Sequence, residues 1–226
     1  MQQKKQMSDS LLLGVVLTLA GGFQDAYSYN GRGGVFANAQ TGNIVLLGQN
    51  LALGEWGTAL RYLFPLLSFL LGVFAAEGIR SLCERVTRLH WRQVILLIEI
   101  AFLLAAGVFP ESLNMVSNVL LSFACAMQVE SFRKFRGIPC ATTMCIGNMR
   151  SATEHLYRWI RTRDPEQKRR SAHYYFIILV FAVGAAIGAL FTMWLGAPSI
   201  WIAAGLLLAG FLLMFSPAEQ AAQEEP

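Results

Sequence analysis

Charged residues are scarce in this chain, and their scarcity excludes the commonest class of protein. Only 14% of the 226 residues are Asp, Glu, Lys or Arg, whereas 55% are hydrophobic. A water-soluble domain carries roughly 25% charged residues. The mean hydropathy of +0.47 also excludes a disordered chain, which lacks the apolar surface that offsets the entropy cost of ordering. The composition therefore predicts a membrane protein.

The sequence patterns of enzymes and metal sites are also missing. The four cysteines form no CxxC pair, and no HExxH, Ser/His or Cys/His pattern is present. No GxxxxGK[ST] phosphate loop occurs either. The net charge of +4 is spread over short clusters between apolar runs, which argues against nucleic acid as a partner. We therefore expect no enzyme activity, no cofactor and no bound metal.

Eight stretches are apolar enough and long enough to be embedded in a membrane. They cover roughly residues 10–29, 35–53, 58–79, 93–109, 113–132, 138–157, 172–195 and 199–215. The second and the sixth are dense in Asn, Gln and Thr. An unpaired polar group in hydrocarbon costs on the order of a few kcal/mol. These two stretches are therefore not expected to cross as ordinary lipid-facing helices.

The positions of Lys and Arg indicate how the remaining stretches cross. Positive charges near short loops collect on the cytoplasmic side. Eight full crossings from a cytoplasmic N-terminus would place the basic loop at 80–92 outside. If the two polar stretches enter and leave on one side, the clusters near 4–5, 80–92, 133–136 and 158–170 all become cytoplasmic. The sequence thus predicts an all-α polytopic membrane protein with six transmembrane helices, two re-entrant or broken helices, and both termini cytoplasmic.

The two halves of the chain resemble each other. The matches occur in order: Gln24-Asp25 with Gln128 and Glu130, Thr41-Gly42-Asn43 with Ile146-Gly147-Asn148, and Gly72 with Gly184. Residues 1–110 and 111–216 are each predicted to form span, re-entrant hairpin, span, span, followed by an acidic polar tail at 217–226. Three spans per half is an odd number, so the second half is expected to lie inverted in the membrane, as in many secondary transporters.

Two segments of the first half, GGFQDA at 21–26 and VFANAQTGN at 35–43, resemble the YoaK family of bacterial inner-membrane proteins. In the second half, AMQ at 126–128, ATT at 141–143 and the Gly-Asn pair at 147–148 are similar to a second motif of that family. The resemblance covers almost the whole chain. It implies the bacterial inner membrane as the location, and it implies no particular substrate.

The polar stretches hold most of the candidate binding residues. Gly tolerates a broken helix, while Thr and Asn either bind a solute or satisfy the freed peptide groups. Helix N-termini meeting there would favour a small anion or carboxylate. Arg150 either binds such an anion or pairs with Glu154. The candidate substrate-binding residues are Gln24, Thr41, Gly42, Asn43, Gln128, Thr143, Gly147, Asn148 and Arg150.

Carboxylates inside apolar spans are candidates for coupling to a proton or ion. Asp25 and Glu130 occupy related positions in the two halves, and we expect Asp25 to carry this role. The alternative is that Asp25 pairs structurally with Arg61 or Arg150. Glu99 has no counterpart in the other half and is not selected.

We expect a membrane permease, a secondary transporter for a small solute such as an anion or organic acid, with a channel-like pore as the alternative. The expected partners are the lipid bilayer and a small-molecule or ion substrate, and a homo-oligomer is compatible with the sequence. Asn43 is expected to lie at the centre of the site, and Asn38 at a more peripheral position. The sequence leaves the substrate, the coupling ion and the direction of transport open.

Overall fold

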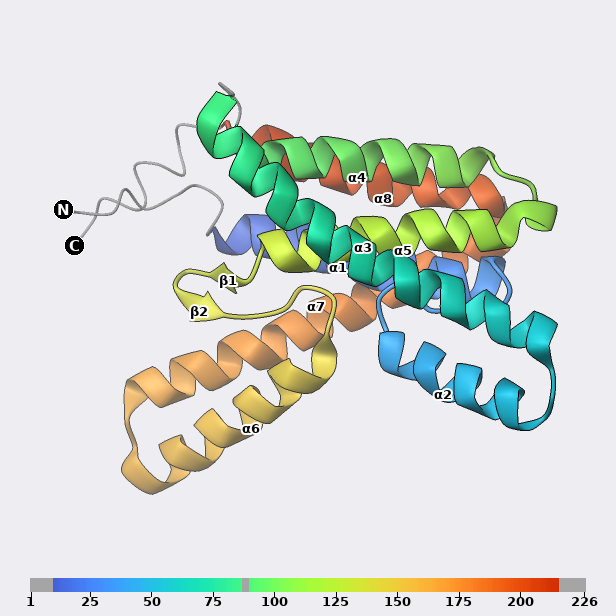
Figure 1. Ribbon diagram of the computed structural model, residues 1–226. Coiled ribbons are helices and arrows are strands. Elements are labelled where there is room, and N and C mark those ends of the chain that lie inside the picture. The colour runs from blue at the N-terminus through green and yellow to red at the C-terminus, as the bar shows by residue number, and fades with distance from the viewer. Residues whose placement is uncertain (1–9, 87–89, 216–226) are drawn as a thin grey trace.

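The computed structural model describes residues 10–86 and 90–215, which are mainly helical (Figure 1). The predicted acidic tail and the basic cluster near residues 4–5 lie outside the described residues. The elements in order are α1 Leu11–Gly31, α2 Gln40–Ala52, α3 Trp56–Val86, α4 Trp91–Val108, η2 Glu111–Leu113, α5 Asn114–Ser131, β1 Lys134–Phe135, β2 Ile138–Pro139, α6 Cys145–Thr162, α7 Pro165–Leu195, η3 Ala197–Ser199 and α8 Ile200–Leu213.

Within the described residues, five helical segments are long and apolar enough to cross a membrane. They are Leu11–Gly31, Trp56–Cys83, Trp91–Val108, Glu111–Ser131 and Pro165–Leu195, and a shorter apolar segment covers Ala197–Leu213. Their outer faces expose large apolar side chains, including Phe74 on α3 (80% exposed) and Met193 on α7 (77% exposed). Apolar surface of this extent is typical of a lipid-facing helix bundle. The chain therefore has the composition and surface of a membrane protein.

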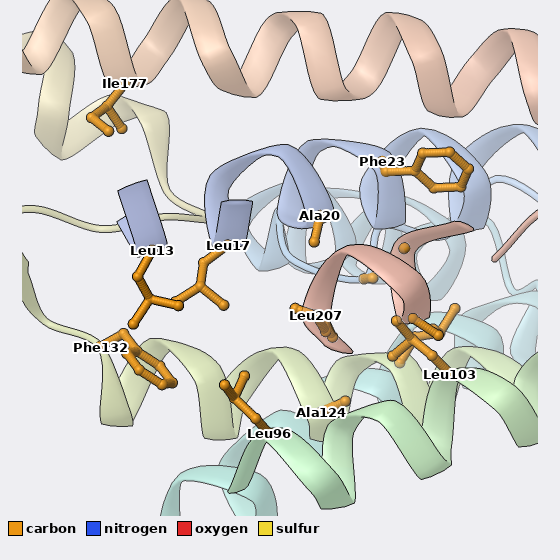
Figure 2. Packing of buried hydrophobic residues seen from close by; sticks show 14 of the residues in the cluster. Leu13, Leu17, Ala20, Phe23, Leu96, Leu103, Ala124, Phe132, Ile177 and Leu207 are labelled. Carbon is orange, nitrogen blue, oxygen red and sulfur yellow. The ribbon is translucent and has the colours of Figure 1, made fainter. Parts of the chain in front are cut away.

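Helix α1 is the most enclosed of these segments. Figure 2 shows Leu13 and Leu17 of α1 pointing toward Phe132 and Leu96, and all four side chains are at most 1% exposed. Leu207 of α8 belongs to the same core. The core thus lies where α1, α4, α5 and α8 come together, and α1 forms its centre.

The first helix of each half packs against helices of the other half. Helix α1 packs on α7 and α8 of the second half, while α5 packs on α3 and α4 of the first. Within each half, α2 packs on α3 and α6 packs on α7, and these two pairs extend from the bundle in different directions (Figure 1). The first helix of each half is therefore held mainly by the other half.

Small residues allow α3 and α5, and likewise α1 and α7, to approach each other closely. A Cβ added to Gly72 of α3 would lie 2.5 Å from the carbonyl oxygen of Phe123 on α5. A Cβ added to Gly184 of α7 would lie 2.3 Å from the carbonyl oxygen of Leu19 on α1. Both distances are shorter than any real contact between a Cβ and an oxygen atom, so only glycine fits at these positions without a shift of the helices. The backbones of α3 and α5, and of α1 and α7, therefore approach each other closely at these glycines.

The two polar stretches, predicted as re-entrant or broken helices, share one layout. Each contains one helix preceded by a non-helical segment, which covers 32–39 before α2 and 132–144 before α6. Gly33 and Gly34 have φ of 85° and 75°, the left-handed region that favours glycine. Arg136 and Gly137 also have positive φ and form the tight turn between β1 and β2. The positive-φ turns explain why these segments are not continued as helix.

Candidate functional site

The first non-helical segment runs back along α1. The backbone N–H of Ala37 donates to Ser28 Oγ (3.0 Å), and that of Asn38 donates to Asp25 Oδ1 (2.7 Å). The side-chain Nδ2 of Asn38 then donates to the carbonyl oxygen of Gly21 (2.7 Å). These three partners succeed one another toward the N-terminus of α1. The chain therefore reverses after α1 and reaches Gly21, the middle residue of that helix.

The second non-helical segment reaches the same point from the other half. A Cβ added to Gly21 would lie 2.9 Å from Thr143 Cγ2, 3.2 Å from the carbonyl oxygen of Thr142 and 3.7 Å from Asn38 Nδ2. Gln128 of α5 fixes this segment, because its Nε2 donates to Thr142 Oγ1 (2.9 Å). The absence of a side chain at Gly21 thus lets both segments meet against the middle of α1.

Buried polar side chains with unused oxygens surround this meeting point. Gln24, one helical turn from Gly21, donates through Nε2 to Glu99 Oε1 (3.3 Å). We call the following residues the central cluster: Gln24, Asp25, Asn38, Glu99, Gln128 and Thr143. All are at most 7% exposed, and all except Asp25 have one buried side-chain oxygen without a hydrogen-bond partner in the described part of the chain. Buried polar groups are normally paired, so these oxygens indicate a place for a ligand or water.

Two helices begin directly after the meeting segments without a side-chain cap. The N-cap residues are Ala39 for α2 and Met144 for α6, and neither gives a capping hydrogen bond. By contrast, Ser10, His90 and Asp164 cap α1, α4 and α7. The first-turn N–H groups of α2 and α6 therefore have no side-chain acceptor from the N-cap. A helix N-terminus also carries partial positive charge, which attracts anions.

Asn43 and Asn148 have matching roles in the two halves. Asn43 Oδ1 accepts from the N–H of Phe36 (3.1 Å), and its Nδ2 donates to the carbonyl of the same residue (2.7 Å). Asn148 does the same with Ala141, at 3.3 and 2.7 Å. Gly42 leaves room for the ring of Phe36, whose Cδ2 would lie 2.9 Å from a Cβ. Each asparagine thus fastens its non-helical segment to its helix, and no hydrogen bond joins the two asparagines among the described residues.

The other residues predicted on these helices lie on the surface of the protein. Thr41 on α2 and Gly147 and Arg150 on α6 are exposed. Glu154 pairs with Arg158, so the expected pair between Arg150 and Glu154 does not form in the described residues. These three positions are close in sequence to the meeting point but do not belong to the central cluster.

The two predicted coupling carboxylates have different surroundings. Asp25 is 7% exposed and accepts a backbone N–H, as described above. Neither Arg61 nor Arg150 forms an ion pair with Asp25 within residues 10–86 and 90–215. Glu130 instead forms an ion pair with Arg133, and no contact joins it to Asp25 among the described residues. Only Asp25 therefore belongs to the central cluster.

Two members of the central cluster were not selected from the sequence. Glu99 is fully buried and bonds Gln24. It has no match in the second half, so a comparison of halves passes over it, although a carboxylate within an apolar span is itself a signal. The expectation that Asn38 is peripheral was wrong, because Asn38 is 3% exposed and contacts both Asp25 and Gly21.

The fold and this site define a helical membrane protein in which two non-helical segments, one from each half, meet at the middle of a central helix. A family model described as "Protein of unknown function (DUF1275)" matches residues 13–213, and the chain belongs to this family, which includes the YoaK-like proteins. Comparison with curated proteins and with solved structures gives no match.

Proposed function

We propose that this protein is a membrane permease, a secondary transporter that binds a small anion or organic acid at the central cluster. The observation that carries the proposal is the meeting of two uncapped helix starts beside the middle of α1. The first-turn N–H groups of α6 offer donors to an anionic group, whereas those of Gln40 and Gly42 on α2 already donate to the carbonyls of Asn38 and Ala39. The unused oxygens of the cluster accept from a hydroxyl, an amine or water. A solute with both kinds of group fits this arrangement.

The path of the first segment supports a re-entrant element. The segment runs back beside α1 from the level of Gly31 to the level of Gly21. These ten helical residues correspond to about 15 Å, which is half of a hydrocarbon core of about 30 Å. If α1 spans the membrane, α2 begins near the midplane and leaves on the side from which the chain entered. We propose six spans, namely the five long segments and the shorter one ending with α8, in the bacterial inner membrane with both termini cytoplasmic.

The packing of each half's first helix against the other half supports two inverted repeats. Helices α1 with α7 and α5 with α3 form equivalent pairs, and Gly184 and Gly72 occupy equivalent contacts within them. Such an arrangement follows when a twofold axis in the membrane plane relates the halves. Secondary transporters built from inverted repeats bind substrate near the midplane between the repeats, where discontinuous helices meet. Rocking of one half against the other would then expose the central cluster alternately to the two sides.

Uptake into liposomes tests the function. The purified chain should show saturable uptake and counterflow of at least one compound from a panel of radiolabelled small carboxylates. Gly21→Val should abolish this uptake, because its side chain would occupy the place where both segments meet α1. Gly205→Val on α8 is the matched control, since a Cβ there meets nothing within 4 Å. Folded wild type that moves no compound would contradict the proposal, and flux that is linear in concentration without counterflow would favour a channel.

Site-directed labelling tests the topology. In a variant whose four native cysteines are replaced by alanine, Glu55→Cys and Ser81→Cys place reporters at the two ends of α3 on exposed positions. A membrane-impermeant thiol reagent should label Glu55→Cys from the periplasm and Ser81→Cys only after the cells are opened. Labelling of both positions from the periplasm would make the six-span topology wrong.

A further inference from the structure

A cavity of about 390 Å³ lies apart from the central cluster, where the glycine turn after α1 faces the starts of α3 and α5. Its lining includes two arginines, Arg32 and Arg61, one carboxylate, Glu111, and two amides, Asn114 and Asn118. The charges of this lining add to a net positive value. None of these side chains belongs to the central cluster, so the cavity needs its own explanation.

Arg32 is a buried cation whose hydrogen-bond partners are all neutral. Its side chain is 1% exposed. Nε donates to Tyr27 Oη (2.8 Å), Nη1 donates to the carbonyl of Phe109 (2.8 Å) and to Asn114 Oδ1 (3.0 Å), and Nη2 donates to the carbonyl of Ala106 (2.6 Å). These bonds hold the guanidinium against the end of α4. They satisfy its donors without neutralising its charge.

No carboxylate of residues 10–86 and 90–215 forms an ion pair with Arg32 or with Arg61. A buried charge without a counter-ion is strongly destabilising, because its hydration is lost and no opposite charge replaces it. Arg61 adds a second guanidinium from α3, exposed and without a partner among the described residues. Glu111 supplies the one negative charge of the lining. The cavity therefore retains a positive charge that a bound anion would balance.

Asn118 adds a requirement for a hydrogen-bond donor. It is 2% exposed, and its Nδ2 donates to the backbone carbonyl of Arg32 (2.9 Å). That bond fixes the orientation of the amide, and its Oδ1 has no partner among the described residues. An anion in the cavity can supply the missing donor through a hydroxyl group.

We propose that this cavity is a second binding site, which holds a small carboxylate that also bears a hydroxyl group. The ligand carboxylate binds Arg61 and balances the charge of Arg32, and the hydroxyl donates to Asn118 Oδ1. The site does not depend on transport, because it is defined by binding at one end of α3. Under the proposed topology this end faces the periplasm, where the cavity would meet solutes before they reach the central cluster.

Anion binding to the purified full chain in detergent tests the site. The probes are lactate and glycerate, with acetate as the carboxylate that lacks a donor, all at one ionic strength. Equilibrium dialysis should show saturable binding of at least one of the first two and much weaker binding of acetate. Arg61→Gln should weaken that binding by about tenfold or more, because a charge-assisted hydrogen bond is lost. Arg80→Gln, on the same helix outside the cavity, should bind like wild type.

Asn114→Asp provides a sharper test, because it replaces a neutral acceptor of Arg32 by a carboxylate of the same shape. The variant should melt at a higher temperature than wild type without added anion, and it should lose the rise in melting temperature that the probe gives wild type. Probe binding that survives both Asn114→Asp and Arg61→Gln would overturn the site, and would be consistent with binding at the central cluster. Failure of both lactate and glycerate to bind, or equal binding of acetate, would overturn the proposal as well.

Discussion

Replacing either Asn43 or Asn148 by alanine is expected to lower the melting temperature of the purified protein and to abolish uptake. Each change strands one partly buried N–H and one partly buried carbonyl, those of Phe36 or those of Ala141. A fully buried stranded group costs about 1–3 kcal/mol, and a partly buried one costs less. The non-helical segment that approaches Gly21 would then lose its attachment to α2 or α6. Melting curves in detergent and uptake into liposomes, measured on the same preparation, check both effects.

Asn50→Ala is the matched control for Asn43→Ala. Its Nδ2 donates to the carbonyl of Leu46 (2.7 Å) within the same helix, away from the meeting point. We expect its uptake to match wild type. The costs of Asn43→Ala and Asn148→Ala should add in the double variant, because the two asparagines share no partner among the described residues. Wild-type melting of Asn43→Ala would show that the attachment is unimportant, and strong non-additivity would show that the two asparagines interact.

The apolar runs predicted the existence of the membrane helices well, and their ends less well. The stretch 93–109 corresponds closely to α4, Trp91–Val108. The stretch 172–195 misses the first two turns of α7, which begins at Pro165 after the N-cap Asp164. Those turns are polar and extend beyond the apolar run, so hydropathy does not detect them, although the Asp-Pro pair is a helix-start signal.

Four of the six residues of the central cluster were selected from the sequence, but the contacts that bring the cluster together were not predictable. The repeated Gly-Asn pairs correctly marked Asn43 and Asn148 as equivalent. Their partners lie seven residues earlier in extended segments, whose path is set by tertiary contacts with α1 that no local pattern encodes. The burial of Arg32 was unpredictable for the same reason. An arginine among glycines is typical of an exposed turn, whereas the end of α4 encloses this side chain.

Replacing Asp25 by asparagine is expected to eliminate uptake driven by a pH gradient while substrate binding remains measurable. The reason is that a carboxylate withdrawn from water can take up and release a proton when the site changes its exposure, and an amide cannot. Asparagine keeps the size of the side chain and an Oδ1 that can accept the N–H of Asn38. The melting temperature of Asp25→Asn should therefore stay close to that of wild type.

Asp25→Ala separates this coupling role from a purely structural one. Alanine removes the acceptor of the Asn38 N–H, so this variant should lose both thermal stability and uptake. If Asp25 only holds the non-helical segment in place, Asp25→Asn should transport like wild type and only Asp25→Ala should fail. Glu154→Gln, which removes an exposed carboxylate on α6, controls for the loss of a negative charge. Full proton-driven uptake by a stable Asp25→Asn protein would reject the coupling role, and Glu99, the other buried carboxylate of the central cluster, would then be the next to replace by its amide.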